Sequence, residues 1–535
     1  MGIYINPGNE GFATARRSTY VDKSGLIAVV NKTIGQKGKL SLISRPRRFG
    51  KSFAAQMLCA YYCRDCDSSA LFADLEIANG TEAERAEYLK HLNQYNVLYL
   101  DITDIIGKAG LDGMLPFIER TLSEEICRLF PDVTPAEKLA DLLVHVAEME
   151  NGKKWIALID EWDAPVRDSD STPAIQKRYL EYLRSFFKSG SVTDKAFAAS
   201  YMTGILPMRK DGSQSAISEF NEYTIMRPGP FAPYVGFLEE EVRMLCEEND
   251  MDFEQMKSWY DGYTVGDIPS VYNPNSVMKA IQAKRYASYW QMSSAADNLL
   301  YYVNMDYEGL AGDVNHLIAD KPVPVDVEDF RNDPKDLRSR DDVITLLIHF
   351  GYLCYDADSG LVRIPNEEIR EEFLRTTRKM HHPDTMRRVK ESDQLIRDTI
   401  NKEADKVAAQ IEKVHREEWE PRFYNNEQSL RGVIKLAYFC YRDNYKMMEE
   451  LASGKGYADI VFLPKKDRGL PALVIELKWK KDVRTAIDQI RDKDYPSALK
   501  DFADEILLVG ISYDKEDPDK THRCVIEALN TPEEE

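Results

Sequence analysis

Short apolar runs alternate with longer helical patterns between residues 40 and 204. Strand-length apolar runs occur in LSLIS (40–44), NVLYLDI (96–102), WIALIDEWD (155–163) and AFAASYMTG (196–204). Segments with helical spacing of apolar residues, such as FAAQMLCAYY and QKRYLEYLRSFF, separate them. This alternation predicts an α/β domain with a parallel sheet.

The pattern changes after residue 234. Residues 235–395 read as helices broken by short loops, which predicts a helical middle region. A charged helical connector then leads to a succession of helix, strand, strand, helix and strand in residues 421–535. We therefore expect three domains: an α/β domain at 1–234, a helical lid or middle domain at 235–395, and a second α/β domain at 396–535.

Composition narrows the class of protein. The chain has 535 residues, of which 43% are hydrophobic and 30% charged, and it shows neither a secretory leader nor an apolar run of membrane-spanning length. We therefore expect a globular cytoplasmic protein without a membrane partner. The net charge of −20 argues against a protein that coats nucleic acid non-specifically. Cys63 and Cys66 form a C-x-x-C, but no second pair stands at zinc spacing, so ordinary helix-end thiols are favoured.

The first chemical motif is RPRRFGKS at residues 45–52, close to the phosphate loop G-x-x-x-x-G-K-[ST]. A predicted strand precedes it and a predicted helix follows it, as a loop that binds phosphate at a helix N-terminus requires. We expect this loop to bind a nucleotide through its residues Arg47, Arg48, Phe49, Gly50, Lys51 and Ser52.

Acidic residues at the end of a later strand complete the expected nucleotide site. Asp160 follows WIALI directly and would bind Mg²⁺ together with Ser52, while Glu161 would polarise the attacking water. Thr203, at the end of the next strand, would sense the terminal phosphate. Arg45 replaces a glycine that takes positive φ easily. Arg45, Arg47 and Arg48 add charge beside the phosphates; a finger-like role and pairing with acids of a neighbouring domain both stay open.

Six short motifs in this order resemble the bacterial AAA-ATPase-like proteins. They are YVDKS (20–24), SRPRRFGKS (44–52), LIDEWDAP (158–165), TGI (203–205), WYDGY (259–263) and YNPNS (272–276). In that family the first loop position is regularly arginine. The resemblance implies an ATP-binding P-loop domain of the additional-strand type, followed by a helical lid.

The second chemical motif lies in GYADIVFLPKKDRGLPALVIELKWKK at residues 456–481. Two strands joined by a polar turn would pair Leu463 with Ala472 and hence Asp459 with Glu476, on one face of the sheet. Lys478 shares that face because side chains alternate along a strand. Carboxylates suit Mg²⁺, so we expect Asp459 and Glu476 to hold the ion and Lys478 to orient the attacking water.

Two further residues are candidates for the same site. Glu427 extends a helical apolar stripe by one turn and would reach the site as a third acid, although it also suits the N-terminal turn of its helix. Gln489 shares a helix face with Lys493 and would face the site or the nucleic acid.

The arrangement of Asp459, Glu476 and Lys478 resembles the PD-(D/E)XK nuclease superfamily, a domain frequently fused behind this ATPase type. The resemblance implies catalytic roles for those three residues and a supporting role for Gln489, with Glu427 as the upstream acid. We therefore expect an enzyme that binds and hydrolyses ATP and controls a Mg²⁺-dependent nuclease. Its substrate would be nucleic acid, with DNA favoured, in defence against foreign DNA; a homo-oligomer stays open.

Two alternative interpretations remain. In one, the protein is an NTP-dependent switch or interaction protein whose nuclease-like domain only docks nucleic acid or protein. In the other, Arg45 spoils the loop and the protein is a mobile-element ATPase without hydrolysis of its own.

Overall fold

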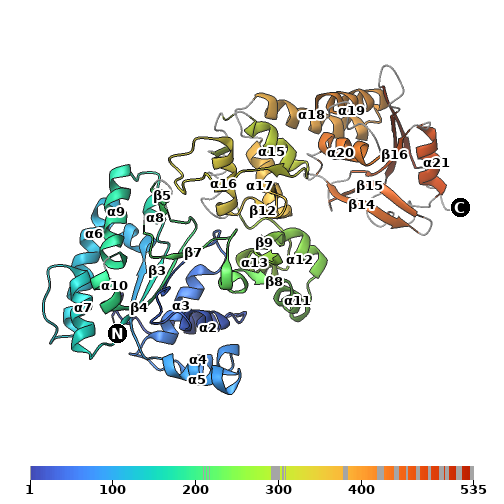
Figure 1. Ribbon diagram of the computed structural model, residues 1–535. Helices are drawn as coiled ribbons and strands as arrows, with labels where there is room; N and C mark the ends of the chain where they lie inside the picture. Colours follow the sequence, from blue (N-terminus) through green and yellow to red (C-terminus); the bar gives the residue numbers. More distant parts are fainter. Residues whose placement is uncertain are drawn as a thin grey trace. The chain divides into compact units, whose positions relative to one another are not determined.

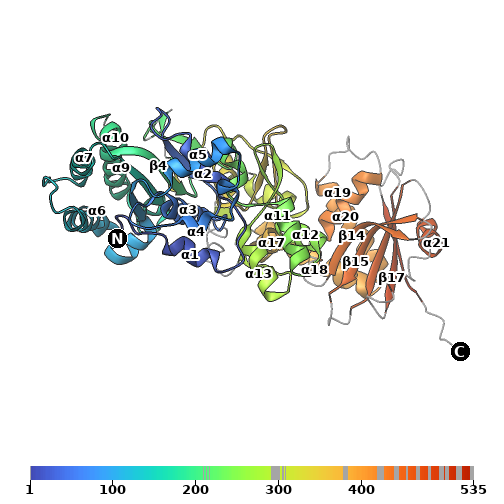
Figure 2. The ribbon, with the colours of Figure 1, turned by 90° about the horizontal axis from the view of Figure 1, so that it is seen from below.

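The computed structural model forms two compact units, which are described separately (Figure 1, Figure 2). The first comprises residues 1–292 and 324–369, and the second residues 293–323 and 370–535. The structure describes residues 2–188, 190–208, 210–211, 214–215, 217–290, 302–303, 307, 309–377, 383–418, 427–438, 441, 445–453, 456–465, 470–479, 483–492, 499, 505–513 and 521–529.

A five-stranded parallel sheet forms the centre of the first unit. Its strand order is β2 (Asn96–Asp101), β3 (Trp155–Asp160), β4 (Phe197–Gly204), β1 (Leu40–Ser44) and β7 (Asn221–Tyr223). The strands β1, β3 and β4 are buried along their whole length because helices cover both faces, as parallel sheets require. The four strands expected from the sequence are confirmed, and β7 adds a fifth. The strand β4 lies between β1 and β3, as expected for the additional-strand type.

Helices cover this sheet (Figure 1). The helix α3 (Lys51–Tyr62) packs on β2, β3 and β4. The remaining helices of this part are α1 (Glu10–Arg16), α2 (Gly25–Asn31), α4 (Ser69–Phe72), α5 (Glu82–His91), α6 (Ile102–Leu129), α7 (Leu139–Met149), α8 (Ala164–Arg167), α9 (Pro173–Phe187) and α10 (Gly190–Ala196). Short turns and strands complete it: η1 (Glu76–Ala78), η2 (Gly229–Tyr234), β5 (Lys210–Asp211) and β6 (Gln214–Ser215).

Local chemistry fixes where several of these helices begin. Asp101 ends β2, and its carboxylate accepts a hydrogen bond from the Asp104 N–H at 3.0 Å, which caps α6. Thr172 caps α9 in the same way, and Pro173 takes the first helical position, where no N–H is needed. Both signals are readable in the sequence.

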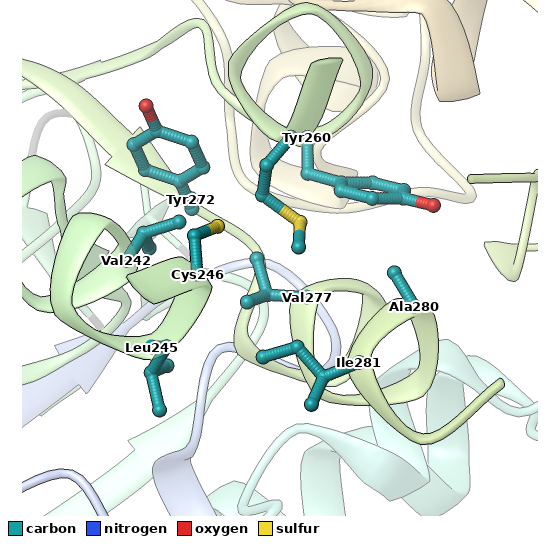
Figure 3. Close-up of a cluster of buried hydrophobic side chains, with 9 residues drawn as sticks. Val242, Leu245, Cys246, Tyr260, Tyr272, Val277, Ala280 and Ile281 are labelled. Atoms are coloured by element: carbon teal, nitrogen blue, oxygen red, sulfur yellow. The ribbon is translucent and has the colours of Figure 1, made fainter. Parts of the chain in front are cut away.

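The middle region contains helices, as expected, together with short strands that the pattern did not signal. Its first part consists of β8 (Phe237–Leu238), α11 (Glu239–Glu248), α12 (Phe253–Tyr260), β9 (Tyr263–Val265), β10 (Ile268–Tyr272) and α13 (Pro274–Ala283). An apolar cluster joins these helices to β10 (Figure 3); it comprises Val242, Leu245, Cys246, Met256, Tyr260, Tyr272, Val277, Ala280 and Ile281. The strands have two to five residues, too short for a period-two pattern to stand out.

A second stretch of the middle region follows later in the chain. It consists of β11 (Val323–Pro324), α16 (Arg340–Phe350), β12 (Cys354–Asp356), β13 (Leu361–Arg363) and α17 (Glu367–Thr377). The strands β12 and β13 form an antiparallel pair. Ser339 and Asp342 form a capping box at the start of α16.

The second unit is built on another five-stranded sheet. Its order is β14 (Tyr445–Ser453), β15 (Gly456–Pro464), β16 (Ala472–Trp479), β17 (Ile506–Tyr513) and β18 (His522–Ala528). Neighbours are antiparallel except β16 and β17, which are parallel and are connected through α21 (Arg484–Asp492). The other helices are α15 (Leu310–Ile318), α18 (Pro383–Ile400), α19 (Ala404–Glu418) and α20 (Glu427–Ala437). The expected α/β class is confirmed, with β14 and β18 as additional edge strands.

In the described part of the chain, no helix is both long enough and apolar enough to cross a membrane.

Candidate nucleotide and nuclease sites

The phosphate loop connects β1 to α3 in the first unit. Gly50 precedes the helix and has φ 88°, and Arg48 also lies in the left-handed region with φ 69°. Glycine adopts this conformation without strain, whereas arginine does so at a cost that is typical of functional loops. The N–H groups of the first helical turn have no partner within the helix. The loop and the helix start therefore form a site suited to an anion.

Lys51 is buried at the start of α3. Its Nζ donates to the carbonyl oxygens of Arg45 at 3.2 Å and Pro46 at 3.0 Å, and lies 3.6 Å from a carboxylate oxygen of Glu161. Only 4% of the residue is exposed. These partners neutralise an ammonium group that would otherwise be unstable in this position. A nucleotide's terminal phosphates would replace the loop carbonyls as its partners.

Arg45 occupies the first loop position, and its side chain reaches the ends of β1 and β7. It is fully buried, and its Nη1 donates to the carbonyl oxygens of Ser44 at 2.9 Å and Tyr223 at 3.0 Å. Burial lowers the pKa of Arg45 to about 10. The expectation that Arg45 adds charge beside the phosphates is therefore wrong, because its guanidinium group links β1 to the carbonyl end of β7.

Asp160 and Thr203 meet at the ends of β3 and β4. The Thr203 hydroxyl donates to Asp160 Oδ1, which also accepts from the Glu161 N–H at 3.2 Å. Asp160 Oδ2 is buried and makes no hydrogen bond to any described residue. Burial raises the pKa of Asp160, while the hydroxyls of Ser52 and Thr203 oppose this shift. A buried carboxylate oxygen beside a serine hydroxyl is a donor set that fits Mg²⁺.

Glu161 is held by two cations. It has φ 52°, its Oε1 faces Lys51, and its Oε2 accepts a hydrogen bond from Arg167 Nη2. Arg167 Nε also donates to Asp163 at 2.8 Å. The same Asp163 oxygen accepts from the N–H groups after β4, those of Ile205 at 3.1 Å and Leu206 at 2.8 Å.

Sequence reasoning missed both Asp163 and Arg167. The signal was present, because Asp163 belongs to the quoted motif LIDEWDAP and Arg167 follows it by four residues, one helical turn. Together they fix the segments after β3 and β4 relative to each other.

The two remaining arginines of the loop have different surroundings. Arg47 lies beside Arg167 and Glu161. Its pKa is lowered mainly by burial and, to a smaller extent, by repulsion from Arg167. Arg48 Nη1 donates to the carbonyl oxygen of Tyr289 at 2.8 Å, in the middle region. Arg47 is thus positioned towards the acid at the nucleotide site, and Arg48 is positioned away from it.

The middle-region residues of the first unit pack directly on the loop. Phe49 is buried with its ring edge-on to Tyr263 at 5.1 Å, and its carbonyl oxygen accepts from the Gly236 N–H at 3.0 Å. A Cβ atom at Gly351 would lie 2.7 Å from Pro46, so glycine permits this close approach. A change in the loop's conformation would disturb these contacts.

Glu368 is a buried carboxyl group beside Arg48. It is 1% exposed and accepts hydrogen bonds from the Ser276 hydroxyl at 3.0 Å and the Tyr289 N–H at 2.7 Å. Burial raises the pKa of Glu368 to about 7. The hydrogen bonds and the nearby Arg48 partly oppose this rise, because they stabilise the carboxylate. Its ionisation is therefore linked to the region that contacts the loop.

In the second unit, β15 and β16 pair in the expected register. Ile460 lies opposite Ile475 and Val461 opposite Val474, so one further step brings Asp459 opposite Glu476. The Leu477 N–H donates to Asp459 Oδ2 at 2.8 Å, which confirms that the aspartate lies against β16.

The three charged residues of this hairpin form one small polar group in an apolar sheet. Lys478 Nζ lies 3.2 Å from Glu476 Oε1, and the two residues are 8% and 2% exposed. A Cβ atom at Gly510, the β17 partner of Glu476, would lie 3.0 Å from Ala486, so α21 packs closely here. Carboxylates at such a position need a cation, and both a lysine and a divalent metal ion supply one.

Arg431 is a functional candidate that the sequence reasoning missed. It lies on α20, and its Nη2 donates to Asp459 Oδ1 at 2.8 Å. It follows Glu427 by four residues on the same helix, which was the available signal. Glu427 begins α20 and Gln489 lies on α21, but the side chains of both fall outside the described residues. Their site roles stay predictions.

Comparison with known proteins identifies two domains in the chain. Residues 9–213 match a family model described as "Predicted AAA-ATPase", and residues 425–522 match one described as "PD-(D/E)XK nuclease superfamily". The chain joins an AAA-ATPase-like domain to a PD-(D/E)XK superfamily domain. The fusion expected from the motifs is thereby confirmed.

Two further matches are more distant. A curated relative, "Uncharacterized protein in vnfD 5'region" of Azotobacter chroococcum mcd 1, is 23% identical over 291 residues, covering 53% of this chain and 52% of that protein. The match thus spans about half the length of the relative. A solved structure, the ORC2 protein of Aeropyrum pernix in ADPNP and ADP complexes, shows 12% identity and a TM-score of 0.25, covering 69% of this chain and 93% of that one. A likeness at this TM-score supports no argument.

The first prediction concerns Glu368. Its pKa is about 7 in the folded protein against 4.5 for the ordinary group, so the folded state binds more protons between these values and its stability falls as pH rises. Glu368→Gln removes this dependence of stability on pH. Between pH 5 and 8 the free energy of unfolding of Glu368→Gln should therefore rise relative to that of the native protein, by at most about 3 kcal/mol. Urea unfolding at several pH values measures the difference.

Glu367→Gln is the matched control, since it changes the neighbouring carboxyl group on the same helix. Parallel pH profiles for the native protein and Glu368→Gln would contradict the assignment.

Proposed function

We propose that nucleotide binding and hydrolysis in the AAA-ATPase-like domain control a Mg²⁺-dependent nuclease in the PD-(D/E)XK domain. The observation that carries the proposal is the meeting of Asp459, Glu476 and Lys478 on paired strands. Residues of this kind bind a divalent ion and balance the charge of a phosphodiester under attack. A role in defence against foreign DNA stays a prediction from the sequence.

In the nucleotide site, each residue has a distinct task. When a nucleotide binds, the Lys51 ammonium group leaves the carbonyl oxygens of its own loop and binds the terminal phosphates. Its hydrogen bonds to charged phosphate oxygens are stronger than those to neutral carbonyl oxygens. Asp160 and Ser52 hold Mg²⁺, and Thr203 fixes the Asp160 carboxylate that it contacts. Glu161 positions the attacking water once Arg167 and Lys51 turn towards the phosphates.

In the nuclease site, Asp459 and Glu476 hold the divalent ion. Bound there, Mg²⁺ would polarise the scissile phosphate and lower the pKa of a water molecule. Lys478 orients the attacking water and neutralises charge as the reaction proceeds. Arg431 would release Asp459 and bind a phosphate oxygen, because a guanidinium group suits both acids and phosphates. Glu427 and Gln489 are proposed supporting residues.

A route for control is available along α17. This helix carries Glu368, which lies beside the loop residue Arg48, and it also carries Arg370. Arg370 donates to the carbonyl oxygens of Leu317 and Ile318 at the end of α15. A displacement of the loop on nucleotide binding would therefore act on α17, the helix that carries Glu368.

The nucleotide site is tested by Lys51→Ala. Charge-assisted hydrogen bonds to phosphate contribute about 1.5–3 kcal/mol each, so affinity for fluorescent ATP should fall by about 10- to 100-fold. Equilibrium fluorescence measures the loss. The exposed Lys37 is the matched control, and Lys37→Ala should bind as the native protein does. Equal binding by Lys51→Ala and the native protein would rule out this site.

The nuclease site is tested by Lys478→Ala. Plasmid and single-stranded DNA and RNA are incubated with full-length protein, Mg²⁺ and ATP, and with EDTA in place of Mg²⁺. The change should lower cleavage by about 10²- to 10⁴-fold, the usual contribution of a group that activates water, while ATP turnover stays near native.

Lys446→Ala serves as its control, because Lys446 is an exposed lysine on β14 of the same sheet. Native cleavage by Lys478→Ala, or cleavage that persists in EDTA, would refute the assignment of these residues.

A second candidate function is an NTP-dependent switch whose nuclease-like domain only docks nucleic acid. The pairing of Asp459 with Arg431 and of Glu476 with Lys478 favours it, because the acids are already neutralised without a metal ion. DNA retention in Mg²⁺ and ATP without any cleavage would support this function over the first.

A further inference from the structure

Two cysteines lie together where the phosphate-loop helix ends. Cys63 follows the last residue of α3, and residues 64 and 65 turn the chain towards Cys66. The Cys66 thiol donates to the Cys63 carbonyl oxygen at 3.4 Å, and the two thiols share a hydrogen bond. A four-residue turn brings its ends within about 7 Å, and bridged cysteines have Cα atoms about 4.4–6.8 Å apart. A turn of this length thus suits a disulfide.

Neighbouring residues hold this turn in place. The Asn93 amide donates to the Cys63 carbonyl oxygen at 2.7 Å and lies 3.7 Å from Cys66 Sγ. Arg64 is bound to Glu150 at 2.9 Å, and Asp65 accepts from the Asn6 amide at 3.0 Å. Both residues between the cysteines are therefore anchored elsewhere, which holds the turn in place.

The two thiols differ in exposure and in acidity. Cys63 is fully buried, whereas Cys66 is partly exposed. The hydrogen bond from Cys63 lowers the pKa of Cys66 to about 7, with a contribution from the Ser68 hydroxyl, while the pKa of Cys63 is raised. Such a pair contains one accessible thiolate that attacks and one protected thiol that follows.

We propose that Cys63 and Cys66 form a reversible dithiol–disulfide site that reacts with disulfides of low-molecular-weight thiols. The Cys66 thiolate attacks one sulfur of the small disulfide, forms a mixed disulfide and expels one thiolate. Cys63 then loses its proton and attacks Cys66 Sγ, which expels the second thiolate and closes the protein disulfide. Two protein thiols are oxidised, and one small disulfide is reduced to two thiols. Neither the proposed nucleotide chemistry nor the proposed nuclease chemistry uses this site.

Oxidised glutathione is the probe that tests the proposal. Full-length protein is incubated with it, blocked with N-ethylmaleimide, digested and mapped by mass spectrometry. The native protein should yield a peptide with a disulfide between Cys63 and Cys66. Cys63→Ser should instead accumulate a glutathione adduct on Cys66, and Cys66→Ser should leave Cys63 unmodified because that thiol is buried.

Cys127 provides the internal control, since it is an exposed cysteine on α6 and does not belong to the turn. Cys127→Ser should form the same Cys63–Cys66 disulfide as the native protein. The native protein should also show Cys66 alkylation with a midpoint near pH 7, and Cys63→Ser should raise that midpoint. A glutathione adduct on Cys66 that is equally stable in the native protein and in Cys63→Ser would overturn the proposal, as would a Cys66 that stays fully alkylatable.

Discussion

The buried ammonium group of Lys51 has to be neutralised, and the nucleotide site is arranged around this requirement. Its partners are two carbonyl oxygens of its own loop and the carboxylate of Glu161. Arg167 donates hydrogen bonds to both Glu161 and Asp163. Asp163 also accepts a hydrogen bond from the backbone N–H of Leu206, after β4. One chain of charges therefore joins the loop to the ends of β3 and β4. Because these strands adjoin in the sheet, the same chain also fixes the position of Asp160 and Thr203.

The second unit also has to neutralise buried charges, and fewer side chains take part. Glu476 and Lys478 are nearly inaccessible and neutralise each other, and Asp459 is shared between Arg431 and the Leu477 N–H. Isolated charges would be costly in a sheet whose other residues here are apolar. In the second unit the acids thus lie within paired strands and are neutralised by Arg431 and Lys478, whereas in the first unit Asp160 ends β3 and accepts from Thr203. Binding of a metal ion in the second unit would therefore rearrange existing ion pairs, whereas in the nucleotide site Asp160 Oδ2 makes no hydrogen bond to any described residue.

The sequence reveals the strands and the hairpin register better than the charge networks. Runs such as WIALI and ALVIEL are apolar enough to be strands in any context, and the prolines that bound the loop between β15 and β16 define their register. The partners Arg167 and Arg431 depend on which helix faces which strand end, and a single sequence does not encode this locally. The short strand β7 is polar and only partly buried, and it is defined by its pairing with β1. Tertiary contacts decide such elements.

Arg45 shows why a departure from the usual loop pattern is compatible with a phosphate site. A glycine at the first position would matter if the backbone there had positive φ, but the left-handed residues of this loop are Arg48 and Gly50. At position 45 the chain still follows the sheet, since the Arg45 N–H donates to the Gly204 carbonyl oxygen at 3.1 Å. The side chain can therefore extend beneath the loop and bind the carbonyl oxygen of Tyr223. Its burial lowers its pKa, so the position has a cost that its contacts with β1 and β7 and its interaction with Tyr201 oppose. Arginine at this position stabilises the base of the loop, while Arg47 and Lys51 remain on the side where the phosphates would bind.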